Sequence, residues 1–199
     1  PVASARLTQA HRRARSRAAL LEAAARQISR AGYGGLKLEQ VAAEAGYTRG
    51  ALYHQFAGKE ALALAAVGWV RETWWEEVGA VFDEPRPPHE ALVELARRHA
   101  VYCRRDIAGV MAALRVEFAA REHPIGAAVR EVARELVARL ARLIEAGRAQ
   151  GSIPPGPPAP ALAAASLSAI EGAVIALAGN PRDDEEVAER VARGLLGVS

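Results

Sequence analysis

Cysteine, aromatic side chains and long apolar runs are scarce in this chain. It contains a single cysteine, Cys103, in 199 residues, which excludes an intrachain disulfide and a multi-cysteine zinc or iron–sulfur site. Aromatic residues make up only 5% of the sequence. No stretch approaches the roughly 20 consecutive apolar residues of a transmembrane helix, and no charged-then-apolar signal peptide is seen at the start. We therefore expect a cytoplasmic protein.

Strand patterns are missing as well. We find no convincing alternation of apolar and polar residues and no Asn-Gly hairpin signal. Alanine, the strongest helix former, occurs 46 times and supplies much of the 51% hydrophobic content. These features predict an all-α protein of about nine helices.

Helical periodicity and its breakers place the expected elements. Glycines near residues 32–35 and 46 and prolines at 85–88 and 154–158 interrupt the apolar periodicity. The predicted helices cover about 13–31, two short segments around 38–45 and 48–56, and a long segment from 59 to about 82. The next are expected around 92–102, from about 107 up to His123-Pro124, and from about 129 to Gly147 or Gly151, followed by about 159–178 and 183–196. We expect an N-terminal domain at 1–57 and a second domain at 58–199.

Positive charge is concentrated at the front of the chain. Residues 1–60 hold ten Lys and Arg against four Glu, whereas the remainder holds sixteen basic against nineteen acidic residues. A basic front third indicates a polyanionic partner, either nucleic acid or an anionic membrane surface. A merely solvated arginine-rich tail is the alternative.

Two short helices that meet at Gly46, with another helix behind them, fit a helix-turn-helix unit. Glycine permits the left-handed turn between them, and Thr48 can cap the second helix. Ile28, Val41, Leu52 and Phe56 are expected to form the small core that sets the angle between these helices.

The order of residues in this region resembles the TetR family of bacterial transcriptional regulators. The resemblance covers roughly residues 15–65 and rests on Gly32-Tyr33, Val41-Ala42, Ala45-Gly46, Gly50, Leu52-Tyr53, Phe56 and Lys59-Glu60-Ala61-Leu62. It implies a ligand-controlled DNA-binding protein that acts as a homodimer on double-stranded operator DNA. It also implies a repressor, with an activator of the same family as the alternative.

The resemblance places a set of residues at the DNA. Arg49 has the reach and the donors to contact a guanine edge, and Tyr53 and Lys59 are placed to bind phosphates. Family members usually carry Thr or Ser where this chain has Lys37, which cannot cap a helix but can reach a phosphate. Either His54 or Gln55 is expected to meet DNA. The expected DNA-binding residues are Lys37, Thr48, Arg49, Gly50, Ala51, Tyr53, His54 and Lys59.

By the same resemblance, the fourth to seventh helices enclose a pocket for a small inducer. Few charges interrupt the apolar faces of these helices, which predicts a largely apolar ligand and no cofactor. The expected lining residues are Trp69, Trp74, Tyr102, Cys103, Met111, Leu114 and Phe118. His99 and Cys103 stand four residues apart and could both touch a metal, but core packing is the simpler explanation, and no metal site is predicted.

The last two helices are expected to form the dimer. Residues 159–178 have apolar or small side chains on nearly every face, more than one partner helix can cover within a monomer. Two copies of the helix pair related by a twofold axis would make a four-helix bundle. The expected interface residues are Leu167, Ile170, Val174, Leu177, Val187, Val191 and Leu195.

Two other function classes are disfavoured. No Gly-x-Ser-x-Gly elbow, phosphate-binding glycine loop or His-Glu-x-x-His pair occurs, which argues against an enzyme. A membrane-surface ligand carrier would use bulky apolar residues in its basic first helix, where this chain has mostly alanine. We expect no membrane partner.

Overall fold

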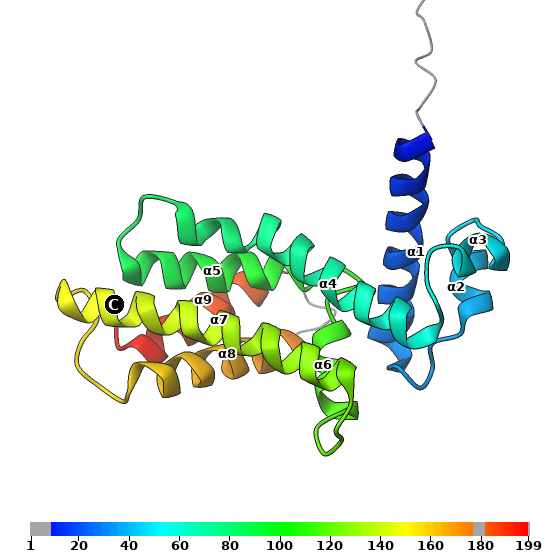
Figure 1. Cartoon of the computed structure of the whole chain (residues 1–199). Helices are drawn as coiled ribbons and strands as arrows, with labels where there is room; N and C mark the ends of the chain where they lie inside the picture. Colours follow the sequence, from blue (N-terminus) through cyan, green and yellow to red (C-terminus); the bar gives the residue numbers. More distant parts are fainter. Residues whose placement is uncertain (1–8, 177–181, 199) are drawn as a thin grey trace, which may run out of the picture. The chain divides into compact units, whose positions relative to one another are not determined.

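The computed structural model describes residues 9–176 and 182–198, and these form helices and connecting turns without a strand. In chain order the helices are α1 (Gln9–Ala31), α2 (Leu38–Glu44), α3 (Arg49–Tyr53), α4 (Lys59–Glu77), a 3-10 helix η1 (Gly79–Asp83), α5 (Pro88–Tyr102), α6 (Val110–Glu117), α7 (Pro124–Ala149), α8 (Ala159–Ala176) and α9 (Asp184–Leu196) (Figure 1). The all-α prediction is confirmed for the described residues.

Two compact units share these helices. The first, unit 1, comprises the described residues up to Val70 together with Gly109–Val129. The second, unit 2, comprises Arg71–Ala108 and the described residues from Arg130 onward. The long helices α4 and α7 therefore contribute residues to both units. The two predicted domains, 1–57 and 58–199, were defined by expected function and not by compactness, so their boundary stays a prediction.

Unit 1 is built around the buried side of α1. Ile28, Val41 and Leu52 are completely buried and Phe56 is 3% exposed, so the core expected for the helix-turn-helix is present. Helix α6 packs against α1 in the same unit. The Glu117 carboxylate at the end of α6 accepts hydrogen bonds from the backbone amides of Tyr33 (2.6 Å) and Gly34 (2.9 Å). This carboxylate ties α6 to the turn between α1 and α2.

Unit 2 is held together by close contact between α5 and α9 (Figure 1). Small side chains on both helices allow the backbones to approach, and Ile170 of α8 packs on them. The cluster contains Val93, Ala96, Ala100, Ile170, Ala188 and Ala192, with Val191 beside it. At the end of the pair, the Arg104 guanidinium binds the Asp184 carboxylate at 3.0 and 2.7 Å.

Helix α4 ends earlier than its apolar periodicity predicts. The expected end was near Phe82, whereas α4 ends at Glu77 and η1 follows. A β-carbon at Gly79 would lie 2.1 Å from the Trp75 ring, so the chain passes directly beneath this indole. Trp75 also packs on Phe82 with ring centroids 5.5 Å apart. The tighter turn thus accommodates an aromatic cluster.

The proline-rich connection between α7 and α8 is irregular but attached to its surroundings. Ile153 is 1% exposed and packs so closely on Gly147 that a β-carbon there would meet it at 2.5 Å. Arg148 donates to the carbonyl oxygen of Pro157 at 2.8 Å. The segment is therefore an ordered connection held by contacts with the end of α7.

Candidate DNA interface and ligand pocket

Helix α3 is short, capped and exposed. Gly46 adopts a left-handed φ of +76° in the preceding turn, and Thr48 Oγ1 accepts a hydrogen bond from the Ala51 amide at 3.2 Å. The predicted cap is confirmed. Leu52 points into the core, which leaves Arg49, Tyr53 and His54 exposed on the other side.

The Arg49 side chain is held by two neighbours. Its guanidinium lies 3.1 Å from the Glu39 carboxylate of α2 and donates to the Tyr53 hydroxyl at 3.4 Å. The same group stacks over the Tyr53 ring, 5.3 Å from its centroid. The Tyr53 hydroxyl and the Glu39 carboxylate raise the pKa of Arg49, which keeps it a cation. The Arg49 guanidinium therefore has one contact on α2 and one on α3.

His54 and Gln55 have different surroundings. Gln55 donates from Nε2 to Ser16 Oγ of α1 at 3.0 Å, while His54 is exposed. Since the Gln55 amide is engaged with α1, His54 is the freer of the two to meet a partner molecule. Sequence reasoning had left this choice open.

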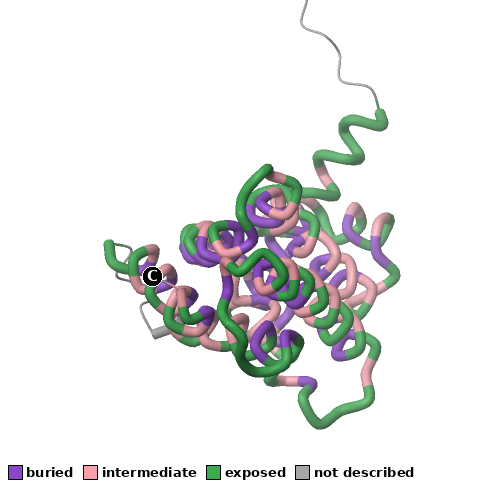
Figure 2. Tube along the Cα trace, turned by 90° about the vertical axis from the view of Figure 1, so that its left-hand side faces the viewer, coloured by how far each residue is buried: buried purple, intermediate pink, exposed green. Residues whose placement is uncertain are grey.

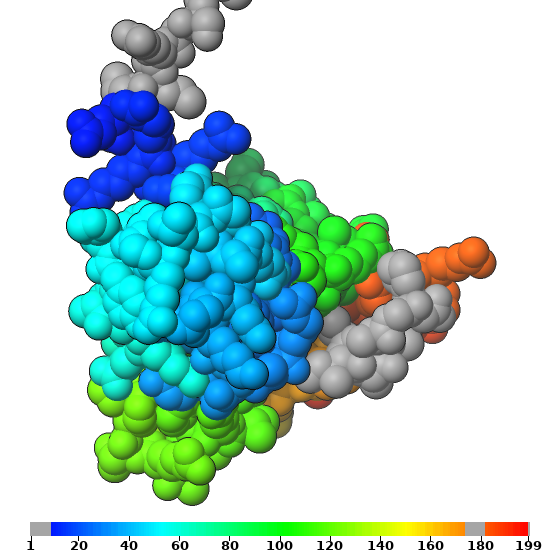
Figure 3. Space-filling view, turned by 90° about the vertical axis from the view of Figure 1, so that its right-hand side faces the viewer, coloured from blue at the N-terminus to red at the C-terminus, as the bar shows by residue number. Residues whose placement is uncertain are grey.

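A broad groove of about 760 Å³ runs between the start of α1 and the α2–α3 region. The first turns of α1 are exposed (Figure 2), and Figure 3 shows this blue helix beside the helix-turn-helix residues. Three arginines give the groove a positive potential. Its lining residues are Gln9, Arg12, Arg13, Arg15, Ser16, Tyr47, Ala51, His54 and Gln55. Sequence analysis singled out the basic charge of this segment but missed Tyr47, which carried no distinguishing pattern.

The remaining expected DNA residues lie in two settings. Lys37 and Gly50 are exposed, and Lys37 makes no side-chain cap on α2, as its chemistry predicts. Lys59 is half-buried at the start of α4, donates to the Gly34 carbonyl oxygen at 3.1 Å and lies 4.7 Å from the Tyr33 ring centroid. Lys59 therefore also supports the α1–α2 turn, which sequence reasoning did not anticipate.

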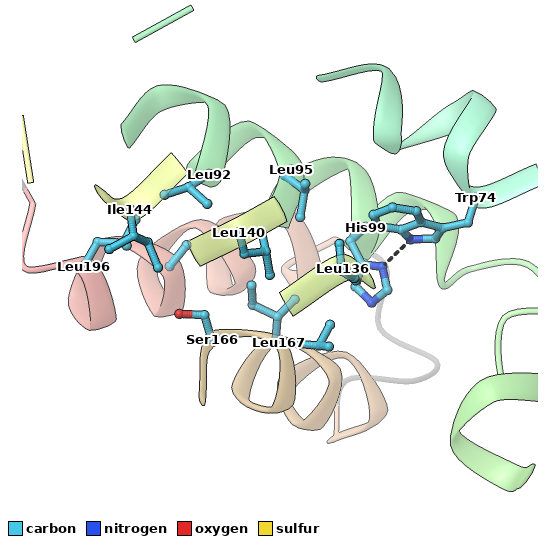
Figure 4. Close-up of a pocket in the computed structure, with 12 residues that line it drawn as sticks. Trp74, Leu92, Leu95, His99, Leu136, Leu140, Ile144, Ser166, Leu167 and Leu196 are labelled. Carbon is cyan, nitrogen blue, oxygen red and sulfur yellow. Dashed lines mark hydrogen bonds between the residues drawn. The ribbon is translucent and has the colours of Figure 1, made fainter. Parts of the chain in front are cut away.

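Unit 2 contains an apolar pocket between five helices (Figure 4). Leu92, Leu95 and His99 recur every three or four residues along α5, which places them on one face. The twelve lining residues are Trp74, Leu92, Leu95, His99, Leu136, Leu140, Ile144, Ser166, Leu167, Ile170, Ala192 and Leu196. The enclosed space is about 20 Å³, room for one water molecule.

His99 is the polar centre of one end of this pocket. Trp74 Nε1 donates to His99 Nδ1 at 2.9 Å, as the dashed line in Figure 4 shows. The other ring nitrogen, Nε2, lies 3.5 Å from Cys103 Sγ. Desolvation lowers the pKa of His99, against a smaller opposing effect of the Glu171 carboxylate. Burial raises the pKa of the Cys103 thiol to about 12. The imidazole and the thiol are therefore both neutral at pH 7.

Comparison with known proteins identifies two matching family models. The model described as bacterial regulatory proteins, tetR family, matches residues 20–66. The model described as the tetracyclin repressor-like C-terminal domain matches residues 89–195, more than half of the chain. The chain belongs to the TetR family of bacterial regulatory proteins.

Individual relatives agree with this family. The HTH-type transcriptional regulator LmrA of Bacillus subtilis (strain 168) is 30% identical over 124 residues, 60% of this chain and 66% of that protein. The structure of AibR in complex with isovaleryl coenzyme A and operator DNA has a TM-score of 0.73 at 23% identity, covering 92% of this chain and 100% of AibR. FadR of Bacillus subtilis in complex with stearoyl-CoA has a TM-score of 0.74 at 18% identity, covering 90% and 97%. These two structures show the TetR fold.

The pocket of this TetR-family chain contains one of the seven expected ligand residues, Trp74. Trp69, Met111, Leu114 and Phe118 belong to unit 1, where Leu114 is completely buried. Phe118 packs on Tyr33 and on His123, with ring centroids 5.7 and 4.5 Å apart. Because α6 packs on α1, its apolar face is part of the unit 1 core.

Tyr102 and Cys103 are in unit 2 but outside the lining of this pocket. Tyr102 is 4% exposed and lies under the Arg105 guanidinium, 5.4 Å from its ring centroid. Cys103 Sγ lies 3.5 Å from Nε2 of the lining residue His99. The rest of the lining comes from α5, α7, α8 and α9, and the sequence signal for the α7 residues is the apolar stripe Leu136, Leu140 and Ile144.

The expected dimer residues divide into three groups. Ile170 is 6% exposed and packs inside unit 2, where it also lines the pocket with Leu167. Val187, Val191 and Leu195 are half-buried on α9. The Val174 side chain and Leu177 lie outside the described residues. A charge introduced at Ile170 would therefore disturb the protomer core itself.

No helix among the described residues is long and apolar enough to cross a membrane. No group of three or more His, Cys, Asp or Glu side chains among them is arranged to hold a metal ion.

Proposed function

We propose that this TetR-family regulator is a repressor that binds operator DNA as a homodimer and is released by a small, largely apolar ligand. The observation that carries the proposal is the exposed α3 with Arg49, Tyr53 and His54 beside a groove lined by three arginines. Recognition helices of helix-turn-helix proteins enter the major groove in this way. An activator of the same family is the alternative.

Each exposed side chain has a suitable role at a duplex. Arg49 has the fork of donors that pairs with the O6 and N7 atoms of guanine, and the small Gly50 and Ala51 allow the helix backbone to approach the bases. Tyr53, Lys37 and Lys59 supply donors for phosphates, which position the protein without reading sequence. The arginines of α1 extend the phosphate contacts beyond α3.

The relatives support this assignment. AibR is described in complex with operator DNA and isovaleryl coenzyme A, and FadR with stearoyl-CoA. The relatives are regulators, and we propose the same role for this chain in place of catalysis. We propose the bacterial cytoplasm as its location, because its proposed target is DNA.

Helix α4 is a continuous connection between the proposed ligand pocket and the unit that contains the proposed DNA-binding residues. Its first residues belong to unit 1, whereas Trp74 near its end lines the pocket of unit 2. A ligand larger than one water molecule must displace some of the lining side chains, and Trp74 is one of the lining residues. We propose that the resulting change in α4 disfavours the arrangement of the DNA-binding helices that fits the operator. The ligand would then bind more tightly to the state of the protein that does not bind DNA.

The dimer is proposed to form through the outer face of α8. Ile170 and Ala163 are buried within the protomer, while the opposite face carries small exposed residues. These are Ala161, Ala164, Ala165, Ser168 and Gly172. Small side chains let two helices approach closely, and a dimer reads two half-sites where a single unit reads one.

The decisive experiment is a binding-site selection followed by titration of Arg49→Ala. We expect specific affinity to fall roughly 5- to 150-fold, equivalent to about 1–3 kcal/mol, with relaxed preference at one base pair. Arg134→Ala is the matched control, because Arg134 is also an exposed arginine paired with a glutamate, Glu131. Unchanged preference at every operator position would refute the assignment of Arg49.

A further inference from the structure

The unit 2 pocket has a specific polar pattern within its apolar wall. None of its twelve described lining residues is Lys, Arg, Asp or Glu. The lining residues with a polar side-chain atom are His99, Trp74 and Ser166. The pattern of donors and acceptors among these groups limits the ligands that the pocket can take.

The contact with Trp74 determines the tautomer of His99. An indole nitrogen only donates, so His99 Nδ1 must be the acceptor and must carry no proton. The proton of the neutral imidazole is then on Nε2, on the side of the ring away from Trp74 in Figure 4. Its present neighbour at 3.5 Å is Cys103 Sγ, and thiol sulfur is a weak acceptor. A ligand oxygen would be a better partner for this N–H.

Ser166 supplies the second polar point. Its Oγ is shielded from solvent and has no hydrogen-bond partner. A buried hydroxyl without a partner is costly, and a polar ligand atom would remove that cost. Figure 4 shows Ser166 on α8, well separated from His99 along the pocket.

The charges near the pocket disfavour an anion. Cations on α5 are already matched by carboxylates, since Arg98 binds Glu84 at 2.7 Å and Arg97 lies 3.7 Å from Glu189. Glu171 acts electrostatically on both His99 and Cys103. An anionic ligand would lose its hydration in a pocket whose described lining residues include no cation.

We propose that the pocket takes an uncharged, mainly apolar ligand whose oxygen accepts a hydrogen bond from His99 Nε2–H, with Ser166 as a second polar contact. Ketones, lactones and alcohols of medium chain length have this chemistry, whereas carboxylates and acyl-coenzyme A do not. The proposal rests on the proposed ligand-controlled function and specifies its ligand class. The pocket must widen on binding, because sites for small molecules usually enclose about 300–1,000 Å³.

The test compares four probes of matched chain length on the full-length protein. 2-Octanone, 1-chlorooctane, octanoate and octanoyl-coenzyme A are titrated at pH 7.5, with tryptophan fluorescence and thermal unfolding as readouts. We expect 2-octanone to bind at least tenfold more tightly than octanoate and octanoyl-coenzyme A. Equal or tighter binding of either anion overturns the proposal, as does failure of 2-octanone to bind up to its solubility limit.

Two variants test the hydrogen bond. His99→Phe keeps a ring but removes the donor, and should reduce the preference for 2-octanone over 1-chlorooctane roughly 2- to 10-fold, the contribution of one hydrogen bond. His99→Gln retains an N–H donor and should keep most of the preference. If circular dichroism shows that His99→Phe does not fold, Trp74→Phe serves instead. It removes the indole donor from His99 Nδ1, so the proton of the neutral imidazole is no longer restricted to Nε2. An unchanged preference in the folded variant contradicts the role of His99.

DNA binding is measured on the same samples without probe. Ketone binding by a wild-type protein that shifts no selected DNA would refute the proposed function and leave the ligand class standing. DNA binding without ketone binding would refute the proposed ligand class and leave the proposed DNA-binding function standing.

Discussion

The guanidinium of Arg49 at the start of α3 lies 3.1 Å from the carboxylate of Glu39 on α2. Both side chains are largely exposed, 62% for Arg49 and 59% for Glu39. In the free protein Glu39 competes with DNA for the residue proposed to read a base. An exposed ion pair of this kind contributes at most about 1 kcal/mol.

Neutralising Glu39 should therefore strengthen DNA binding in general. We expect Glu39→Gln to raise affinity for random duplex DNA several-fold, up to the roughly fivefold equivalent of about 1 kcal/mol. Fluorescence anisotropy at two salt concentrations measures this. Glu131→Gln, which removes the partner of Arg134 on α7, is the control and should change little. Weaker binding by Glu39→Gln would instead indicate that Glu39 itself contacts DNA.

Truncation of a leucine in the pocket should enlarge the ligand space. Leu140 is 4% exposed and lines the pocket, so Leu140→Ala should cost about 2–5 kcal/mol of stability while 2-octanone binds more tightly. Leu114→Ala, in the unit 1 core, should cost a similar amount without changing ketone binding. Thermal unfolding and fluorescence titration separate the two effects. Equal changes in ketone binding for both variants would show that the pocket is not the binding site.

His99 should make stability depend on pH. Its pKa in the folded protein is below the usual 6.5, so the unfolded chain takes up a proton at a higher pH than the folded protein does. Stability contributed by neutral His99 is then full above about pH 7 and is lost as the pH falls through 6.5 toward the lowered folded value.

The expected loss between pH 7 and 5.5 is up to about 1 kcal/mol in wild type and smaller in His99→Gln. Chemical denaturation at both pH values measures it. The Arg104 guanidinium lowers the pKa of Asp184 below its usual 3.8, so that carboxylate changes charge outside this window. The same pH dependence in His99→Gln as in wild type would assign the loss to another group.

The proposed dimer can be tested without disturbing the protomer core. Ala165 lies on the exposed face of α8, and Ala165→Arg should place a charge at the interface while the helices of the protomer remain intact. We expect the variant to sediment as a monomer and to bind operator DNA weakly. Ala138→Arg, on an exposed face of α7 in the same unit, should remain a dimer. A monomeric wild-type protein at micromolar concentration would contradict the proposal.

Local chemistry in the sequence was enough to predict the helix-turn-helix. The turn at Gly46, the cap at Thr48 and the buried side of α3 depend on residues a few positions apart. Helix ends depend on similarly local groups, which is why most predicted bounds agree with the structure. The end of α4 was wrong because Trp75 packs over Gly79, a contact that periodicity does not contain.

The membership of each core and of the pocket was decided by tertiary structure. An apolar stripe shows that a helix face is covered but does not show which helix covers it. Glu117 binds amides 83 and 84 residues away, and α6 with Leu114 and Phe118 therefore joins the core of unit 1. Ile170 likewise faces α5 and α9 of its own protomer. The sequence by itself determined the helix-turn-helix with its turn and its cap, because these depend on neighbours along the chain. Only the packing of distant segments decided which side chains line the unit 2 pocket.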